Sequence, residues 1–155
     1  MKVIKAPQRM NLPAEEGPSI FLAGSIEMDT AERWQERAEK MFENTNFVVL
    51  NPRRDEWDSS WEQNYDNPQF RQQVEWELRG LENSNYKIFY FSPGTMSPIT
   101  LLELGRAASE WNTAVVCPEG YQRKGNVDIF CEVNKIPQFN TLEEAVQFIK
   151  DKEKQ

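Results

Sequence analysis

The apolar run Tyr86-Lys87-Ile88-Phe89-Tyr90-Phe91 is followed by the turn Ser92-Pro93-Gly94-Thr95 and, after one methionine, by Ser97-Pro98-Ile99-Thr100-Leu101-Leu102-Glu103-Leu104-Gly105. A serine followed by a proline is typical of a helix N-cap and first helical position. The stretch therefore predicts a buried strand, a loop and a helix N-terminus, which is where ligands bind in open parallel α/β sheets. Glu103 is the one charged residue of this apolar helix, which makes it the first candidate for chemistry.

A second interpretation of Glu103 comes from its spacing. Glu103, Arg106 and Glu110 stand at i, i+3 and i+7, which also fits a solvent-exposed helix face with one ion pair. The pattern alone leaves both interpretations open.

Strand-like and helix-like patterns alternate five times along the chain, and no hairpin signal joins two strands. This favours an α/β fold with a doubly wound, five-stranded parallel sheet in three layers. We expect strands at residues 19–23, 47–50, 86–91, 113–117 and 136–139, with Asp29 or Thr30 capping a first helix to about residue 44 and Thr141 capping a last one to about residue 150. We expect short helices after residue 97 and at residues 127–133. The 155 residues suit a single domain, with residues 1–18 as a loose lead-in and 151–155 as a charged tail.

Composition excludes several classes of function. The chain has no histidine, so histidine bases and histidine-ligated metals are ruled out, and Cys117 and Cys131 are too few and too far apart for a zinc site. The net charge of −7 disfavours nucleic acid as a partner. No apolar run approaches the roughly 20 residues that span a bilayer, and no signal-peptide pattern is present, so we expect a cytoplasmic protein with reduced thiols.

The helix expected at residues 67–81 carries a second candidate carboxylate. Its predicted apolar stripe consists of Phe70, Val74, Leu78 and Leu81. Glu77 falls at the edge of this stripe, and a carboxylate on the inner side of a helix needs polar partners or a purpose. The alternative is a glutamate that reaches solvent and pairs with Arg71 or Arg79.

Residues that follow the strands should meet at one edge of the sheet. They include Gly24 and Ser25 after the first strand and Asn51, Arg53 and Asp55 after the second. The two adjacent arginines that begin at position 53 are suited to a phosphate, or they balance the acidic residues that follow them.

The segment at residues 53–67 is long for a connection, and long loops in compact domains are usually functional or disordered. Its aromatic residues argue against disorder. Trp57 and Trp61 are therefore predicted to form a lid or wall that stacks a base, or else to cover an edge of the core.

Four motifs, in order, resemble the nucleoside 2-deoxyribosyltransferase family, and most closely its nucleoside 2-deoxyribosyltransferase-like branch. They are Phe21-Leu22-Ala23-Gly24-Ser25-Ile26, Val74-Glu75-Trp76-Glu77-Leu78, the segment from Ser97 to Gly105, and Gly125-Asn126-Val127-Asp128-Ile129. The resemblance covers roughly residues 19–150. It implies a flavodoxin-like fold and an enzyme that needs no metal or cofactor.

The resemblance also implies roles for individual residues. Glu103 takes the place of the nucleophile and Glu77 that of an acidic catalytic residue, as glutamate where aspartate is more usual. Asn126 resembles an asparagine that a neighbouring subunit lends to the sugar 5′-hydroxyl, so a homo-oligomer is expected. Ser97 stands where the family often has an aspartate, a difference that bears on base recognition or proton transfer.

The expected activity is cleavage of the N-glycosidic bond of a 2′-deoxynucleoside through a covalent deoxyribosyl-glutamate, with transfer of the sugar to a free nucleobase. Two alternatives remain. Water captures the intermediate, which gives an N-glycosidase for 2′-deoxynucleoside 5′-monophosphates, or the fold serves as a non-catalytic nucleotide sensor.

Overall fold

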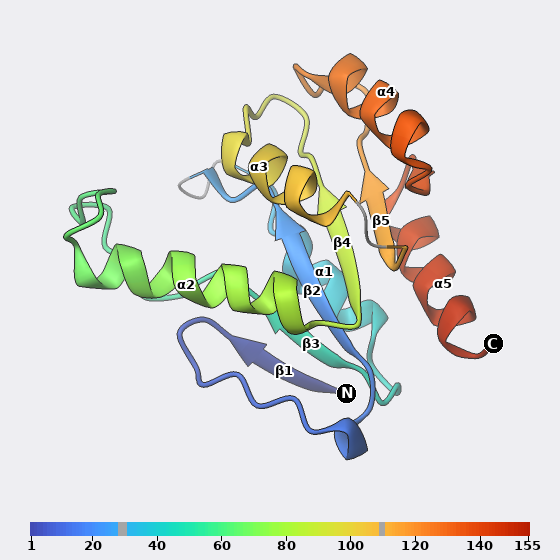
Figure 1. Ribbon diagram of the computed structural model, residues 1–155, viewed down its shortest axis with the longest axis horizontal. Helices are drawn as coiled ribbons and strands as arrows, with labels where there is room; N and C mark the ends of the chain where they lie inside the picture. Colours follow the sequence, from blue (N-terminus) through green and yellow to red (C-terminus); the bar gives the residue numbers. More distant parts are fainter. Residues whose placement is uncertain (28–30, 109–110) are drawn as a thin grey trace.

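A single parallel sheet of six strands, in the order β1-β3-β2-β4-β5-β6, forms the centre of the molecule (Figure 1). The computed structural model describes residues 1–27, 31–108 and 111–155. Within these ranges the strands are β1 (Lys2–Lys5), β2 (Ser19–Gly24), β3 (Val48–Asn51), β4 (Tyr86–Tyr90), β5 (Thr113–Val116) and β6 (Gln138–Phe139). The predicted α/β class with a parallel sheet is confirmed.

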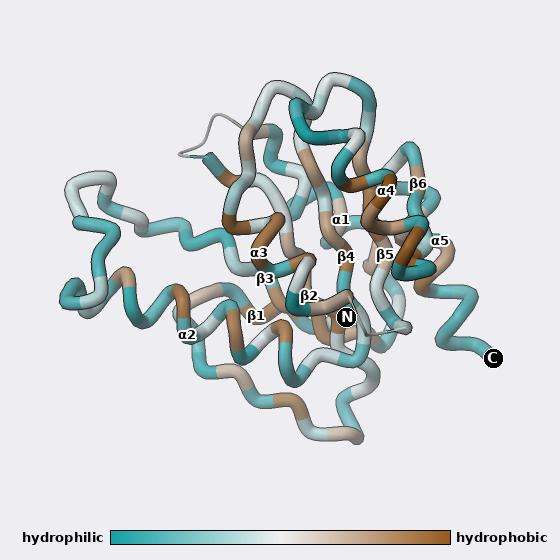
Figure 2. The backbone as a smooth tube through the Cα atoms, turned by 45° about the horizontal axis from the view of Figure 1, so that its top comes forward, coloured by the Kyte–Doolittle hydropathy of each residue, from teal (hydrophilic) through white to brown (hydrophobic). Residues whose placement is uncertain are grey.

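Helices cover both faces of the sheet, which gives three layers. On one face, α1 (Trp34–Met41) and α5 (Leu142–Glu153) bury Trp34, Phe42 and Ile149 against the strands. On the other, α2 (Pro68–Asn83), α3 (Pro98–Ala107) and α4 (Lys124–Asn134) form a second core. Figure 2 shows apolar residues along the strands and at intervals along the helices, whereas the segment that leads into α2 is teal to white.

The expected lead-in at residues 1–18 is wrong, and so is the strand count of five. Lys2–Lys5 form β1, which pairs in parallel with β3 at the edge of the sheet, and a single 3₁₀ turn, η1 (Ala14–Glu16), follows it. Only Ile4 of this strand is fully buried. A short edge strand of four residues can therefore form here with few apolar side chains. Two apolar residues between two lysines are too weak a pattern to predict a strand.

Element boundaries also differ from expectation. The first helix begins at Trp34, with Arg33 at the N-cap position, and the predicted caps Asp29 and Thr30 lie outside the described residues. The last strand is only two residues long, and α5 runs three residues into the predicted tail. Thr141 caps α5 in a complete capping box with Glu144, as predicted.

The face of α2 that contacts the sheet is not the predicted stripe. Leu78 is exposed, and the buried residues are Gln73, Trp76, Gly80 and Leu81. Gly80 explains the rotation, because a Cβ at this position would lie 2.4 Å from the ring of Phe21. The helix therefore approaches β2 along its Gly80 side, which leaves Glu77 beside the contact face.

Candidate active site

The chain changes direction across the sheet between β2 and β4, since β3 lies on one side of β2 and β5 on the far side of β4. Such a switch point at the carboxyl ends of parallel strands is where open α/β sheets bind ligands. Ser25 follows β2, and the loop from Ser92 to Ser97 follows β4 and leads into α3. The predicted site residues Gly24, Ser25 and Ser97 therefore meet at this point.

Three hydroxyls form a buried cluster at the switch point. The Oγ of Ser25 lies 3.1 Å from Oγ1 of Thr95 and also bonds Oγ of Ser97, and the last two oxygens are 2.8 Å apart. The backbone N–H of Ser92 donates to Ser25 Oγ at 2.9 Å. Ser97 is the N-cap residue of α3, as predicted, but its side chain joins this cluster instead of capping the helix.

Gly24 allows the close packing behind this cluster. A Cβ at Gly24 would lie 2.5 Å from the ring of Trp34 and 2.5 Å from the carbonyl oxygen of Tyr90. Trp34 stacks on Tyr90, with ring centroids 5.0 Å apart, and its Nε1 donates to the carbonyl oxygen of Ser25 at 3.1 Å. The Gly-Ser pair thus positions the turn after β2 through contacts that a larger residue would prevent.

Glu103 lies on the inner side of α3, and only 9% of its surface is exposed. Its Oε2 is buried with no hydrogen-bond partner among the described residues. This burial excludes the solvent-exposed face that its spacing also allowed, and Glu110, the last member of that pattern, lies outside the described residues. A buried carboxylate oxygen without a donor is costly, so its position calls for a functional reason.

Glu77 extends from α2 toward the same region. Its Oε1 accepts a hydrogen bond of 3.1 Å from Nε2 of Gln73, one turn earlier, and the same amide donates to the carbonyl oxygen of Pro52 at 2.7 Å. Gln73 therefore holds the side chain of Glu77 in place without supplying a positive charge. The alternative ion pair with Arg71 or Arg79 is not formed among the described residues, and Arg71 pairs with Glu75 at 2.8 Å.

Both carboxyl groups hold protons more tightly than an ordinary glutamate does. Burial raises the pKa of Glu103 to about 8, and the nearby charge of Glu77 adds to this shift. Burial raises the pKa of Glu77 to about 7, against the hydrogen bond from Gln73, which lowers it. Two interacting carboxyls in a desolvated site retain a proton near neutral pH, as acid and nucleophile pairs do in glycosidases.

The sequence model of the family described as nucleoside 2-deoxyribosyltransferase like matches residues 17–121. The chain belongs to this family. The match contains Gly24, Ser25, Glu77, Ser97 and Glu103, and it ends before α4 begins. A search of curated proteins found no match.

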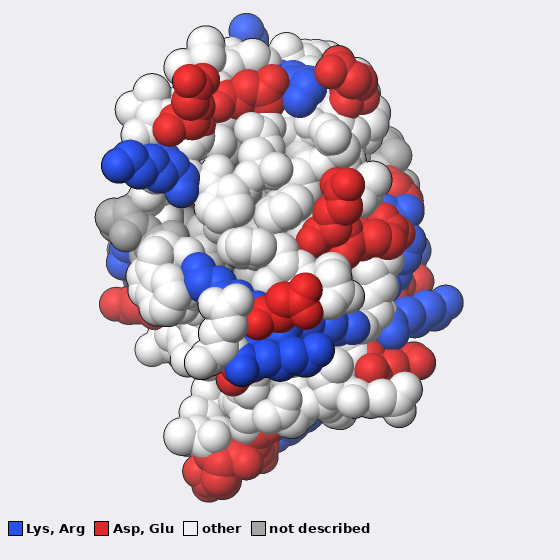
Figure 3. All heavy atoms as spheres, turned by 90° about the vertical axis from the view of Figure 1, so that its right-hand side faces the viewer, with Lys and Arg blue, Asp and Glu red and all other residues white. Residues whose placement is uncertain are grey.

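Asn126, in the fourth motif that resembles the family, is exposed near the start of α4. It lines a cleft of about 120 Å³ between α3 and α4, together with Leu101, Leu104 and Gly105. Glu103 does not line this cleft, and its electrostatic partner is Glu77 of α2, so we infer that α3 separates Glu103 from Asn126 of the same chain. The side of the molecule that α4 and α5 form has a broad uncharged area with charged side chains along its border (Figure 3).

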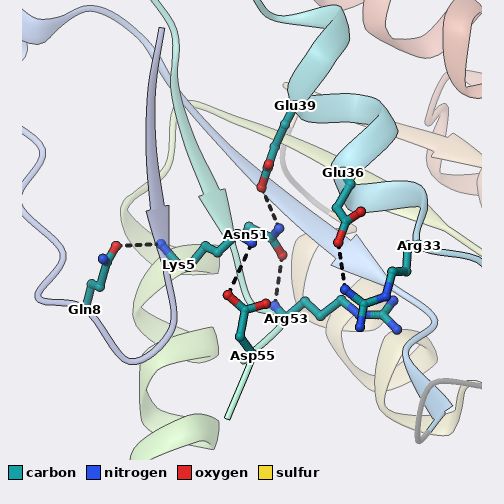
Figure 4. Close-up of polar contacts among 8 residues, drawn as sticks. All are labelled: Lys5, Gln8, Arg33, Glu36, Glu39, Asn51, Arg53 and Asp55. Carbon is teal, nitrogen blue, oxygen red and sulfur yellow. Dashed lines mark hydrogen bonds and ion pairs between the residues drawn. The ribbon is translucent and has the colours of Figure 1, made fainter. Parts of the chain in front are cut away.

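Asn51, Arg53 and Asp55 form a separate polar group at the end of β3 (Figure 4). Asn51 is buried, and its amide donates to Glu39 at 2.6 Å and accepts from the backbone N–H of Arg53 at 2.9 Å. Arg53 is buried beside Gln35 of α1, and Asp55 pairs with Lys5 of β1 at 3.4 Å. These contacts fix the end of β3.

Trp57 and Trp61 lie in the segment that projects past the sheet at the start of α2 (Figure 1). Their rings meet edge to face with centroids 5.0 Å apart, and the guanidinium of Arg54 lies 5.1 Å from the centroid of Trp61. The aromatic pair therefore packs on its own segment. Whether it covers a bound base remains a prediction.

Two site residues escaped sequence analysis. They are Gln73, whose inward orientation depends on the rotation of α2 about its contact at Gly80, and Glu27. The Oε1 of Glu27 accepts hydrogen bonds from the backbone N–H groups of Met96 and Ser97 at 2.7 and 2.5 Å. The available sequence signal for Glu27 was its position, a carboxylate two residues after the Gly-Ser turn.

The larger of the two clefts described, of about 910 Å³, lies away from these residues. It runs between residues 7–12 and the side of α2 that carries Arg71 and Arg79. Glu77 lies on another side of this helix, so the cleft and the carboxylate pair are separate.

Within residues 1–27, 31–108 and 111–155, no group of three or more acidic or cysteine side chains is arranged to hold a metal ion. In the same ranges, no helix has the length and apolar character to cross a membrane.

Proposed function

We propose that this protein cleaves the N-glycosidic bond of 2′-deoxynucleosides and transfers the sugar to another nucleobase. The observation that carries the proposal is the pair of buried Glu103 and partly buried Glu77, both with raised pKa values. The pair lies beside the switch point of the sheet, in a chain of the nucleoside 2-deoxyribosyltransferase-like family. Perturbed carboxyls in such a place are characteristic of catalytic sites.

In the first half-reaction, the carboxylate of Glu103 attacks C1′ of the deoxyribose and forms a glycosyl ester while the bond from C1′ to the base nitrogen breaks. The electron pair of that bond goes to the base, and protonated Glu77 supplies the proton that the leaving nitrogen or a conjugated base atom takes up. In the second half-reaction, a nitrogen of the acceptor base attacks C1′, Glu103 leaves as carboxylate, and the acceptor's proton returns to Glu77. Atoms and charge therefore balance over the cycle without a metal or a redox cofactor.

The shared proton suits this chemistry. Between its two proton dissociations the desolvated pair shares one proton and carries one negative charge. The higher pKa, about 8 against about 7, makes Glu103 the more frequent holder of that proton, so attack begins when the proton passes to Glu77 and leaves Glu103 ionised. The hydrogen bond from Gln73 keeps the Glu77 side chain in a fixed orientation, so that the proton is presented at a defined place.

A panel of deoxynucleosides and deoxynucleoside monophosphates, each incubated with and without a different free base, tests the proposal by chromatography of the products. Transfer predicts a new deoxynucleoside only when the acceptor base is present. Free base and deoxyribose, or deoxyribose 5-phosphate, formed without exchange would show a hydrolase instead. Absence of turnover across the panel, together with tight binding of a nucleotide, would favour the sensor.

We further propose that the site is completed by a second copy of the chain. Two observations support this: Asn126 is separated from its own Glu103 by α3, and the neighbouring surfaces of α3 and α4 expose large apolar side chains. These are Met96, Ile99, Leu102, Ile129 and Val133. Exposed apolar surface of this kind marks association sites.

Mixing two inactive variants tests this arrangement. In a mixed oligomer of Glu103→Gln and Asn126→Ala chains, one site contains Glu103 from one chain and Asn126 from the other. Activity should then return on mixing, and light scattering should give a mass above that of one chain. No recovery on mixing, or full activity of a preparation with the mass of one chain, would refute a shared site.

A further inference from the structure

The backbone amides at the head of α3, which we define as the N–H groups of Met96 and Ser97, already hold an anionic side chain. Both groups donate to a single oxygen, Oε1 of Glu27, at 2.7 and 2.5 Å. Ser97 has positive φ and ψ values of 45° and 53°, in the left-handed region. Successive N–H groups that converge in this way form a concavity suited to an anion.

The surroundings of this concavity are also those of an anion site. It lies where α3 begins, and the positive end of a helix dipole favours negative charge. The hydroxyls of Ser25, Thr95 and Ser97 lie behind it and bond one another. In this chain a carboxylate of the protein itself occupies the place that an anionic group of a ligand would take.

The loop that carries these amides has further support. The hydroxyl of Tyr121 donates to the carbonyl oxygen of Met96 at 2.8 Å, and the N–H of Gly94 donates to the carbonyl oxygen of Gly120 at 3.1 Å. The segment after β5 therefore holds the loop by two hydrogen bonds that do not involve Glu27. The head of α3 is expected to keep its shape when the charge of Glu27 is removed.

The head of α3 is close to the carboxylate that we assign to the reaction. Glu103 follows Ser97 by six residues, so it stands less than two turns along the same helix, and helical side chains lean toward the N-terminus. A nucleoside attacked by Glu103 has groups on its sugar within reach of the head of α3. A phosphate on that sugar would meet the Glu27 carboxylate in a partly desolvated place, where like charges repel strongly.

We propose that Glu27 is a specificity-determining residue that makes the site select uncharged 2′-deoxynucleosides over their 5′-monophosphates. The inference rests on the proposed function, because its substrate is the 2′-deoxynucleoside named there. It adds one residue, Glu27, that discriminates between the substrate without and with a 5′-phosphate. Discrimination then comes from a repulsive group that is built into the site.

Binding measurements on chains that carry Glu103→Gln test the proposal, because no ligand is consumed. Calorimetry compares each deoxynucleoside with its own 5′-monophosphate. We expect the deoxynucleoside to bind at least about tenfold more tightly, and Glu27→Gln to reduce this ratio by about tenfold or more. Glutamine keeps an oxygen acceptor for the two amides and removes only the charge.

Glu119→Gln provides the matched control. Glu119 is an exposed carboxylate in the loop after β5, near the same edge of the sheet, and its substitution removes the same charge. It should leave the ratio unchanged. Equal effects of the two substitutions, or a parent chain that binds monophosphates as tightly as deoxynucleosides, would overturn the proposal.

A phosphate titration gives a readout that does not depend on the reaction. Inorganic phosphate should bind the Glu27→Ala chain and not the chain with Glu27, and thermal melting should show both to be folded. If binding shows the expected ratio while the wild-type protein turns nothing over, the proposed reaction fails and the selectivity stands. If turnover occurs equally with deoxynucleosides and monophosphates, the selectivity fails alone, and if neither ligand binds, both fail.

Discussion

Two groups of carboxylates flank the carboxyl ends of the strands, and their electrostatic surroundings are opposite. Near β3, Glu36 pairs with Arg33 at 2.7 Å, and the hydrogen bond from Arg33 holds the pKa of Glu36 below its ordinary value. Between α2 and α3, burial and mutual repulsion raise the pKa of Glu103, and burial raises that of Glu77. Among the described residues, Gln73 is the one hydrogen-bond donor shown for this second pair.

The difference separates carboxylates that support the fold from carboxylates that are suited to react. A paired carboxylate stays ionised and contributes modestly to stability. A buried carboxyl without a counter-ion lowers stability when it ionises, and sites of chemistry are where proteins retain such groups. We therefore propose catalysis for the α2–α3 pair and a structural role for the group near β3, and each proposal can be tested.

The largest expected effect is on activity, from Glu103→Gln. Loss of the attacking oxygen should reduce the rate of deoxyribosyl transfer by at least about 10³-fold, because an amide does not form the glycosyl ester. Chromatographic assays measure the rate, and circular dichroism checks the fold. Turnover within a few fold of wild type would remove Glu103 from the mechanism.

Glu77→Gln should have the next largest effect, a fall in kcat of about 10²–10⁴-fold, because glutamine cannot protonate the leaving base. Glu75→Gln is the matched control, since Glu75 is an exposed residue of the same helix that pairs with Arg71. The loss should be smaller for bases that leave readily without protonation. Equal losses in the two variants would mean that α2 contributes packing alone.

Stability should depend on pH in a direction set by the α2–α3 pair. The unfolded chain releases the protons of Glu77 and Glu103 near the ordinary pKa of 4.5, and the folded chain keeps them to about pH 7 and 8. Between these limits the folded state binds more protons, so its stability is highest at the acid end and falls as the pH rises. The change in Tm that Glu103→Gln causes should therefore be more positive at pH 9 than at pH 5, by about 3 °C or more. A Tm difference that is the same at both pH values would argue against a raised pKa.

The smallest effect is expected from Glu36→Gln. Removing one member of an exposed ion pair should cost less than about 1 kcal/mol in the free energy of unfolding and leave transfer activity unchanged. Urea denaturation measures the first quantity and the product assay the second. A large loss of activity would place the group near β3 in the reaction and erase the contrast between the two regions.

Most of the fold was predictable, because strands that are buried on both faces have strong local patterns. The run from Tyr86 to Phe91 and the Ser-Pro helix start gave β4 and the beginning of α3. The edge strand Lys2–Lys5 was missed because its pairing depends on the backbone of β3 and little on its own side chains. The rotation of α2 was missed because it depends on a contact of Gly80 with Phe21, a residue 59 positions earlier.

The sequence predicted a site with carboxylates at the carboxyl ends of the strands, but it identified only some of the residues that lie there. Glu103 stood out as a charge in an apolar helix, and the structure buries it. Its role in a reaction stays a prediction. Asn51, Arg53 and Asp55 follow a strand too, but their contacts with Glu39, Gln35 and Lys5 come from elements far away in the sequence. The bonds between Glu27 and the head of α3 also join distant positions, so a pattern of neighbours along the chain did not reveal them.

The edge strand β1 limits pairing between the sheet edges of different molecules. The outer side of an edge strand can pair with other chains, yet β1 is only four residues long and has a lysine at each end. Gln8 also bonds the backbone N–H and C=O of Lys5. These lysines pair with Glu16 and Asp55 and keep charge along the rim. Without residues 1–5, the buried and strongly apolar strand β3 would become the edge, and its backbone would be open to cross-chain pairing. Variants intended for crystallisation or storage at high concentration should therefore keep these five residues.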